Sequence, residues 1–307
     1  MIYTLTLNPA IDYLTSVEEF ALGTVNQTQK QEFYPGGKGI NVSRVLRELN
    51  VPTVALGFIA GFSGSFIEQS LKEFNISTAF VKLEEGNTRI NMKLKTEATE
   101  TEINAAGPKI SLENTQQLFQ KLEALKPSDS LVLAGKIANG MPINFYEEVI
   151  GKLKHRGINF VVDATGKALL STLKHHPFLI KPNSHELEEI FDTKIEGVSE
   201  TIHYGKKLQE KGAKNVLISR GKDGAILLTE EGAVYEGKSP VGTLQNSVGA
   251  GDSMVAGFLA GYLKTKNYEE ALKLGLASGS ATAFNDDLAK KEAIENLLGK
   301  VSTKKMN

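Results

Sequence analysis

From about residue 111 onward, short apolar runs alternate with segments whose apolar residues recur at helical spacing. The runs at 130–134 and 158–163 follow helical patterns over 118–125 and 145–153. Later runs lie at 178–180, 216–219 and 225–229, and later helical patterns lie at 184–191, 200–211, 252–264, 269–284 and 289–299. Because neighbouring parallel strands need a crossover between them, this alternation predicts an α/β fold. We expect a mostly parallel sheet covered by helices on both faces.

Two segments of the N-terminal part break this rhythm, namely 12–35 and 87–106. Over 90–94, apolar residues alternate with polar ones, which is typical of a strand with one apolar and one polar face. We therefore expect these segments to form a small accessory sheet on a single domain that spans residues 1–307. The polar tail 302–307 is expected to be frayed.

The composition excludes several classes of protein. The 307 residues include 35 lysines and arginines against 36 acidic residues, a formal net charge of −1, so the chain lacks the positive field of a nucleic-acid-binding protein. There is no cysteine, which excludes disulfides and thiolate metal sites. The first residues do not resemble a signal peptide, and the longest strongly apolar stretch, 254–263, is too short to span a bilayer. We expect a cytoplasmic protein with no nucleic-acid or membrane partner.

The glycines are most informative where they precede a helix. The run Asn246-Ser-Val-Gly-Ala-Gly-Asp-Ser253 leads into an apolar helical segment. Its backbone N–H groups and the helix N-terminus would form an anion site at Gly249, Ala250 and Gly251. Asp252 could accept a proton from a hydroxyl group beside a bound phosphoryl group. The alternative is that Asp252 only caps the helix, but the Gly-Ala-Gly prefix favours the catalytic interpretation.

A second glycine cluster, Pro35-Gly-Gly-Lys-Gly-Ile-Asn-Val42, also opens a helix. Here Lys38 and Asn41 could hydrogen-bond a sugar or its phosphate. The cluster lacks the spacing of a Walker A loop and of a dinucleotide fingerprint. The residues alone therefore leave a binding loop and a plain turn equally open.

Three further motifs have simple structural explanations. Asn183 and Glu186 have the spacing of a capping box at a helix start, with a Mg²⁺–water site as the alternative. Gly221 and Gly224 lie between two apolar runs, where a hairpin turn is the simplest interpretation. The pair 286–287, two adjacent aspartates, is expected to be a solvated helix cap.

Taken together, these motifs resemble those of the ribokinase-like, or PfkB, carbohydrate kinases over essentially the whole chain. The resemblance is carried by Thr6-Leu-Asn-Pro-Ala-Ile-Asp12, Gly36-Gly-Lys-Gly-Ile-Asn-Val-Ser43, Lys181-Pro-Asn-x-x-Glu186 and Asn246-Ser-Val-Gly-Ala-Gly-Asp-Ser253. The first two motifs look like the branch that acts on sugar phosphates, namely 1-phosphofructokinases and tagatose-6-phosphate kinases. The resemblance implies a three-layer α/β/α sandwich with a small β-sheet lid that is often used for dimerisation.

The resemblance also implies roles for the matched residues. Asp252 would be the base that deprotonates the attacking sugar hydroxyl, and Gly249, Ala250 and Gly251 would form the anion hole for the transferring phosphoryl group. Sugar hydroxyls would be held by Asp12, Gly37 and Asn41, with Lys38 and Arg89 near the phosphate that the sugar already carries. ATP would be bound by Lys181, Asn183, Ser219, Gly221 and Gly224, with Gly279 and Ser280 near the adenine. Glu186 would act on Mg²⁺ through water, and K⁺ is a further candidate ion.

One departure from the family pattern concerns the residue after Gly135. Where relatives carry a small polar residue, this chain has Lys136, which either adds a phosphate contact or remains a surface side chain. We expect an ATP-dependent kinase of a ketohexose monophosphate, which converts fructose 1-phosphate to fructose 1,6-bisphosphate and forms a homodimer through the lid. The alternatives are a tagatose-6-phosphate kinase and, from another class, a non-catalytic sugar-phosphate or nucleotide sensor on the same fold.

Overall fold

The computed structural model describes residues 1–97 and 99–306, and over these residues the main sheet has 11 strands. In sheet order the strands are β15 (Ser302–Lys305), β14 (Val234–Lys238), β13 (Ala225–Leu228), β12 (Asn215–Ser219), β11 (Leu179–Ile180), β10 (Asn159–Asp163), β9 (Ser130–Ala134), β1 (Ile2–Thr6), β4 (Thr53–Ala60) and β5 (Ser77–Thr78), with β6 (Val81–Leu83) also paired to β4. All pairs from β12 to β6 are parallel, whereas β13, β14 and β15 are antiparallel. The predicted α/β fold with a mostly parallel sheet is confirmed.

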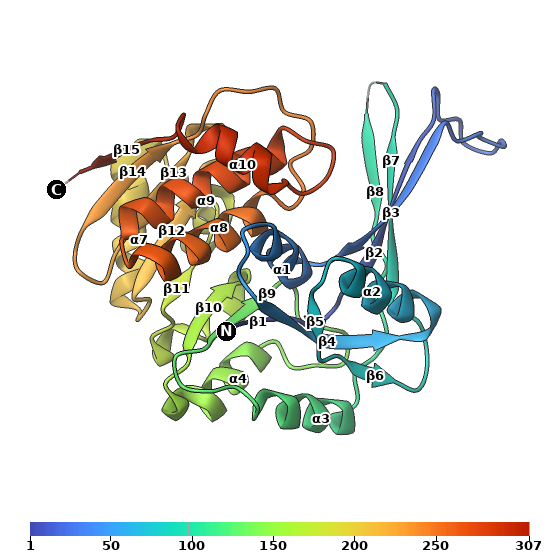
Figure 1. Ribbon diagram of the computed structural model, residues 1–307, viewed down its shortest axis with the longest axis horizontal. Coiled ribbons are helices and arrows are strands. Elements are labelled where there is room, and N and C mark those ends of the chain that lie inside the picture. The colour runs from blue at the N-terminus through green and yellow to red at the C-terminus, as the bar shows by residue number, and fades with distance from the viewer. Residues whose placement is uncertain (98, 307) are drawn as a thin grey trace.

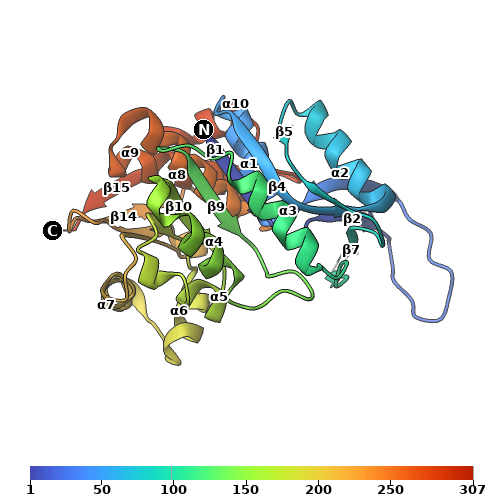
Figure 2. The ribbon, with the colours of Figure 1, turned by 90° about the horizontal axis from the view of Figure 1, so that it is seen from below.

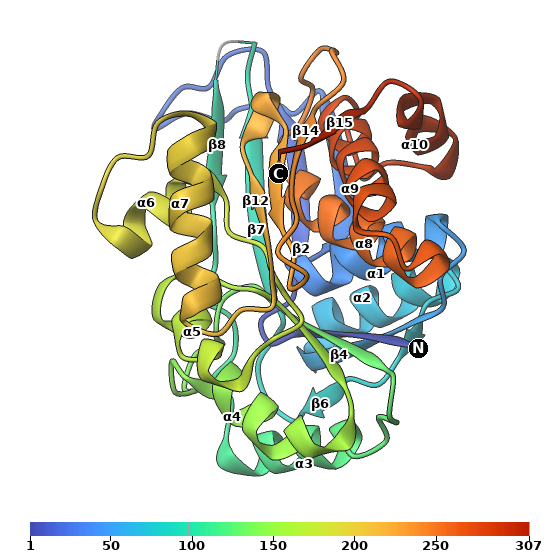
Figure 3. The ribbon, with the colours of Figure 1, turned by 90° about the vertical axis from the view of Figure 1, so that its left-hand side faces the viewer.

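Helices cover both faces of this sheet (Figure 3). One layer contains α1 (Lys38–Glu48), α8 (Ala250–Thr265), α9 (Tyr268–Ala283) and α10 (Lys291–Leu298). The other contains α3 (Leu112–Leu122), α4 (Phe145–Leu153), α5 (Gly166–Leu170), α6 (Ser184–Phe191) and α7 (Gly197–Glu210). Alternate residues of a strand serve the two layers, because Leu131 and Leu133 join one core while Val132 and Ala134 join the other. None of the helices formed by the described residues is both long and apolar enough to cross a membrane.

A second, four-stranded sheet projects from this body (Figure 1). Its strands, in order, are β3 (Lys30–Gly36), β2 (Ala10–Ser16), β7 (Arg89–Lys95) and β8 (Glu100–Ile103). It joins the body through Ile11, which packs with Ile40 and with Ile67 of α2 (Gly61–Glu73). The expected small sheet is therefore present, although residue 98 within the segment 87–106 lies outside the described residues. We call this sheet the lid.

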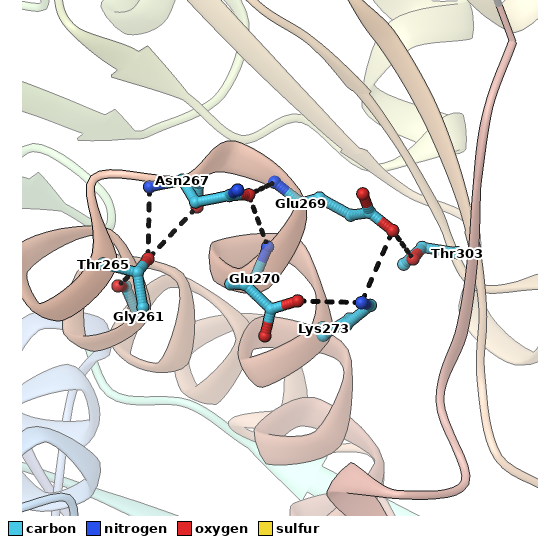
Figure 4. A network of polar contacts seen from close by, with 7 residues as sticks. All are labelled: Gly261, Thr265, Asn267, Glu269, Glu270, Lys273 and Thr303. Atoms are coloured by element: carbon cyan, nitrogen blue, oxygen red, sulfur yellow. Dashed lines mark hydrogen bonds and ion pairs between the residues drawn. The ribbon is translucent and has the colours of Figure 1, made fainter.

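The expectation of a frayed tail is wrong for 302–306, and residue 307 lies outside the described residues. β15 pairs with the open edge of β14, so its backbone groups complete a sheet edge. Its Thr303 Oγ1 also donates a hydrogen bond to Glu269 Oε1 at 2.6 Å, and Lys273 Nζ lies 3.4 Å from the same oxygen (Figure 4). The polar tail is thus held by its pairing rather than by burial.

Candidate active site

The predicted catalytic loop enters α8 through a left-handed turn at Gly249, whose φ is 78°. A side chain does not fit here, because a Cβ atom built on Gly249 would lie 2.5 Å from Leu288 Cδ2. Ala250 donates its N–H to the carbonyl oxygen of Ser247 at 3.3 Å, which closes the turn. The start of α8 therefore presents the positive end of a helix dipole to an anion, and the first-turn N–H groups that follow Ala250 have no intrahelical acceptor.

Asp252 lies in the first turn of α8 and is only 5% exposed. Its Oδ2 accepts a hydrogen bond from Asn41 Nδ2 at 2.8 Å, and none of the described side chains caps this helix, so the capping interpretation is wrong. Burial, followed by the charge of Asp163, raises the pKa of Asp252 to about 6, while Lys38, Asn41 and Lys181 act in the opposite direction. Asp252 is thus a buried carboxyl whose pKa lies closer to neutral pH than usual, as expected of a candidate general base.

Asp163, at the carboxyl end of β10, is a site residue that none of the sequence motifs contains. Its side chain is fully buried, and Oδ1 lies 3.0 Å from Lys38 Nζ and 3.4 Å from Lys181 Nζ. Burial alone would raise the pKa of Asp163, but the charges of Lys181 and Lys38 outweigh it and lower the pKa. Its Oδ2 has no hydrogen-bond partner within the described part of the chain. The sequence does carry one signal for Asp163, because it is an acidic residue at the end of an apolar strand. α/β proteins bind ligands at the carboxyl ends of such strands.

The two lysines link the starts of α1 and α8. Burial by itself would lower the pKa of Lys38, but the carboxylates of Asp163, Asp252 and Glu186 together raise it. Lys181 lies against the other helix, since a Cβ atom built on Gly251 would be 3.2 Å from its Nζ. Lys38 is therefore charged, and the Nζ atoms of both lysines lie beside the predicted anion hole.

The lid supplies Asp12 to the sugar side of the site. Asp12 Oδ1 accepts a hydrogen bond from Asn91 Nδ2 at 3.0 Å, and Lys93 Nζ lies 3.7 Å from Oδ2. Gly36 allows this approach, because a Cβ atom built there would be 2.5 Å from Asp12 Oδ2. A cavity of about 30 Å³ between the lid and the body is lined by both Asp12 and Asn41. Two of the predicted sugar-binding residues thus share one cavity; the third, Gly37, immediately precedes α1 with a φ of 116°.

Lys38 and Arg89, which are predicted to lie near the phosphate of the sugar, are found at the edge of the region between the lid and α1. Lys38 is engaged with Asp163, as described, and Arg89 Nε donates to the carbonyl oxygen of Asn8 at 3.2 Å. Lys136 is exposed on the turn after β9. The preceding Gly135 approaches Lys38, since a Cβ atom built on it would be 3.8 Å from Lys38 Cβ. Lys136 therefore lies next to the segment that begins α1.

On the nucleotide side, a pocket of about 430 Å³ adjoins the end of β12. Its lining includes three predicted nucleotide-binding residues, Asn183, Ser219 and Gly221. Asn183 Oδ1 accepts the N–H of Glu186 at 2.8 Å, and Glu186 Oε2 accepts the N–H of Asn183 at 2.9 Å. The predicted capping box at the start of α6 is confirmed, and it leaves the suggested Mg²⁺ role of Glu186 a prediction.

Gly224, Gly279 and Ser280 are not among the residues that line this pocket. Gly224 ends the turn between antiparallel β12 and β13, which confirms the hairpin. Its φ is 88°, and a Cβ atom built on it would collide with the carbonyl oxygen of Gly237, so both observations favour glycine here. Gly279 lets α9 approach the start of α8, since a Cβ atom there would be 3.0 Å from the carbonyl oxygen of Ala250. Ser280 is buried beside it on α9.

The expectation that the aspartates at 286–287 form a solvated helix cap is wrong for Asp287. α10 begins after Lys290, and the carboxylate of Asp287 instead pairs with the buried Arg44 of α1. Sequence spacing could not reveal this contact, because the two residues are 243 positions apart.

A helix start that can accept an anion, beside a buried carboxyl with a raised pKa, suits the transfer of a phosphoryl group to a hydroxyl group. The family model described as "pfkB family carbohydrate kinase" matches residues 5–291. The chain therefore belongs to this family of carbohydrate kinases. The 1-phosphofructokinase of Bacillus subtilis is 48% identical over 306 residues, covering 100% of both chains. The D-tagatose-1-phosphate kinase of Bacillus licheniformis is 37% identical over 289 residues, covering 94% of each. Among solved structures, Escherichia coli phosphofructokinase-2 in complex with substrates and products superposes with a TM-score of 0.92 at 27% identity, covering 97% of this chain and 98% of that one.

Proposed function

We propose that this carbohydrate kinase transfers the γ-phosphoryl group of ATP to a free hydroxyl group of fructose 1-phosphate, which yields fructose 1,6-bisphosphate. The observation that carries the proposal is Asp252, a buried carboxylate with a pKa of about 6 at the start of a helix opened by glycine. The choice of sugar is supported by the 48% identity to a 1-phosphofructokinase over the full chain.

In this proposal Asp252 accepts the proton of the sugar hydroxyl group while the hydroxyl oxygen bonds to the γ-phosphorus of ATP. The bond from that phosphorus to the β–γ bridging oxygen breaks, and ADP leaves. Charge on the transferring phosphoryl oxygens is stabilised by the backbone at Gly249, Ala250 and Gly251, with Lys181 alongside. With a pKa of about 6, Asp252 is ionised at neutral pH and still basic enough to take the proton.

The sugar is placed between the lid and α1. Asp12, Gly37 and Asn41 hold its hydroxyl groups, and the shared cavity of Asp12 and Asn41 supports this placement. Lys38 and Arg89 are assigned to the phosphate that the sugar already carries. Lys136 remains exposed on the neighbouring turn, so a phosphate contact from it is compatible with the same placement.

ATP is assigned to the residues around the pocket at the end of β12. The set is Lys181, Asn183, Ser219, Gly221 and Gly224, with Gly279 and Ser280 near the adenine. Mg²⁺ usually keeps several waters and takes one or two carboxylates. The unpartnered Oδ2 of Asp163 and the carboxylate of Glu186 fit such a site, where the ion would neutralise phosphate charge. Whether K⁺ is also needed is tested by replacing it with Na⁺ in the assay.

The decisive experiment measures ADP release with ATP, Mg²⁺ and one sugar at a time. Fructose 1-phosphate, tagatose 6-phosphate, tagatose 1-phosphate, fructose 6-phosphate and unphosphorylated fructose are compared by kcat/KM. We expect the largest value for fructose 1-phosphate. A larger value for another phosphate would overturn the substrate assignment, and no ADP with any sugar would favour the sensor alternative.

A tagatose phosphate is the second candidate substrate. The full-length relative described as a D-tagatose-1-phosphate kinase favours this class, and tagatose 6-phosphate is the form suggested by the sequence motifs. Fructose and tagatose differ in the configuration of one hydroxyl group, so discrimination depends on the hydrogen bonds at Asp12 and Asn41. The same kcat/KM comparison separates the two sugars.

We also propose that two copies of the chain associate through the lid in the cytoplasm. The lid leaves Phe33, Ile103, Ile90 and Met92 exposed, and the loop that follows β2 carries exposed Leu22 and Val25 and extends away from the body (Figure 2). So much apolar surface on one small sheet is typical of an interface. Light scattering of the wild-type chain and of an Ile103→Asp, Phe33→Asp variant tests this proposal, with a dimer and a monomer as the expected states. A monomeric wild type contradicts it.

A further inference from the structure

Arg44 of α1 is a buried arginine with no place in the predicted binding set. It is 7% exposed, and its two terminal nitrogens both contact the carboxylate of Asp287, with Nη1 3.2 Å from Oδ1. The guanidinium also lies 4.9 Å from the ring centroid of Phe74 and 5.9 Å from that of the lid residue Tyr34. The bidentate contact with Asp287 and the two nearby aromatic rings together fix this arginine in one orientation.

Asp287 belongs to the loop 284–290, which supports the catalytic loop 246–251. Asn246 Nδ2 donates to the carbonyl oxygen of Asp286 at 2.9 Å, just before Asp287. Leu288, just after it, fills the space beside the left-handed turn at Gly249. The loops 284–290 and 246–251 therefore stabilise each other, and the ion pair between Asp287 and Arg44 connects them to α1.

We propose that Arg44 and Asp287 are positioning residues for phosphoryl transfer, because they fix the anion hole relative to the base. α1 holds Asp252 directly through Asn41, one turn before Arg44, and holds the loop of Gly249 indirectly through Asp287. One helix thus holds both the carboxyl group of the proposed proton acceptor and the turn that opens α8. The inference rests on the proposed function of Asp252 and the glycine loop.

A second ion pair between α1 and the C-terminal segment provides a matched control. Glu48 Oε1 lies 3.1 Å from Lys290 Nζ, and Glu48 Oε2 accepts the N–H of Lys291 at 3.2 Å. This pair also connects α1 to the segment before α10, but neither side chain lines the cavity of Asp12 and Asn41, which Arg44 and Asp287 do line. If ion pairs between α1 and this segment only stabilise the fold, the loss of either pair should lower the melting temperature and leave kcat unchanged.

The experiment compares kcat, the KM for fructose 1-phosphate, the KM for ATP and the melting temperature for Asp287→Asn, Arg44→Lys and Glu48→Gln. Misplacement of reacting groups by about 1 Å costs about 100-fold in rate, so we expect Asp287→Asn and Arg44→Lys each to lower kcat about 10- to 100-fold. The KM for ATP should change by less than about 3-fold, because neither residue lines the pocket at the end of β12. Glu48→Gln should retain kcat within about 2-fold. The double variant Arg44→Lys, Asp287→Asn should lose no more than the worse single variant, because the two residues act as one unit.

A wild-type kcat in Asp287→Asn overturns the inference, and so does an equal loss of kcat in Glu48→Gln. Should Asp287→Asn fail to fold, Arg44→Lys keeps the positive charge and gives the same test. Asp252→Asn in the same assay separates the two proposals. Wild-type turnover in Asp252→Asn overturns the proposed function, whereas its loss together with wild-type turnover in Asp287→Asn and Arg44→Lys overturns only the positioning role.

Discussion

Asp252 and Asp163 are two buried carboxylates near the same pair of lysines, yet their pKa values move in opposite directions. The pKa of Asp252 rises to about 6, and that of Asp163 falls below its ordinary value. The difference lies in the nearest partner of each group. Asp163 Oδ1 contacts both ammonium groups, at 3.0 and 3.4 Å, whereas the direct hydrogen bond to Asp252 comes from the neutral amide of Asn41.

This contrast assigns different roles to chemically identical side chains. Burial disfavours both charges, but only Asp163 has two cations close enough to outweigh that effect, so it remains an anion and holds the lysines. Asp252 also experiences the negative charge of Asp163, which makes it the better proton acceptor. Pairs of acidic groups whose pKa values are driven apart are typical of catalytic sites.

The largest effect that this comparison predicts is on turnover in Asp252→Asn. Loss of the base should lower kcat about 10²–10⁴-fold, measured by ADP release at pH 7.5. A variant that retains more than about a tenth of wild-type kcat contradicts the assignment of the base.

The same variant should not be destabilised. The pKa of Asp252 is raised in the folded state from 3.8 to about 6, so the protonated form favours folding. That contribution is full below pH 3.8 and has been lost once the pH exceeds about 6. At pH 7 the ionised carboxylate therefore opposes folding, and a neutral asparagine should leave the melting temperature equal or higher.

In contrast to Asp252→Asn, the variant Asp163→Asn should lower the free energy of unfolding. It leaves the buried Lys181 and the half-buried Lys38 without their shared counter-charge, and breaking a buried ion pair typically costs about 3–5 kcal/mol. Urea unfolding at pH 7 measures the loss. Because the folded-state pKa of Asp163 is lowered, its contribution is present at neutral pH and is lost only as the pH falls below the ordinary value of 3.8.

Asp129→Asn is the matched control for this loss. Asp129 is also largely buried, but it precedes β9 at the opposite end of the parallel strands, where its Oδ1 lies 3.0 Å from the half-exposed N-terminal ammonium of Met1. The cationic partner of Asp129 is exposed, which makes this ion pair weaker, so removing the charge should cost no more than about 1–2 kcal/mol. An equal cost for both variants would show that the lysine pair gives Asp163 no special role.

The sequence predicts the local parts of this arrangement well. The strand expected at 130–134 and the helix expected at 145–153 have the observed bounds, because apolar periodicity is a property of consecutive residues. Asp252, Asn41 and Lys181 come from motifs in which glycine or proline marks a turn before or near a helix. In all three cases the signal and the predicted site residue are neighbours in the chain.

What the sequence does not predict depends on distant partners. Asp163 acquires its role from Lys38, which is 125 positions away, and Asp287 is engaged by Arg44 across 243 positions. The strand at the polar tail likewise depends on the free edge of β14 and not on any apolar pattern of its own. Pairing of this kind becomes visible only when the chain is folded.

The next largest predicted effect is the pH dependence of the wild-type enzyme. Asp252 acts as a base only when ionised, so kcat/KM for fructose 1-phosphate should be level above its pKa of about 6. Below that value it should fall about tenfold per pH unit, because kcat/KM reports ionisation in the free enzyme. Asp163 should add no second fall in this range, since its pKa is lowered. Rates measured from pH 5 to 8 test the comparison, and a level profile down to pH 5 contradicts it.

The smallest predicted effect is a shift of this profile in Asn41→Ala. The hydrogen bond from Asn41 stabilises the ionised form of Asp252, so its removal should move the fall in kcat/KM upward by about one pH unit. Asn91→Ala is the control, because Asn91 donates the comparable hydrogen bond, at 3.0 Å, to Asp12 rather than to Asp252. It should weaken sugar binding and leave the position of the fall unchanged. Equal shifts in both variants would mean that the amide of Asn41 does not tune the base, and the contrast between Asp252 and Asp163 would then rest on burial and the lysines alone.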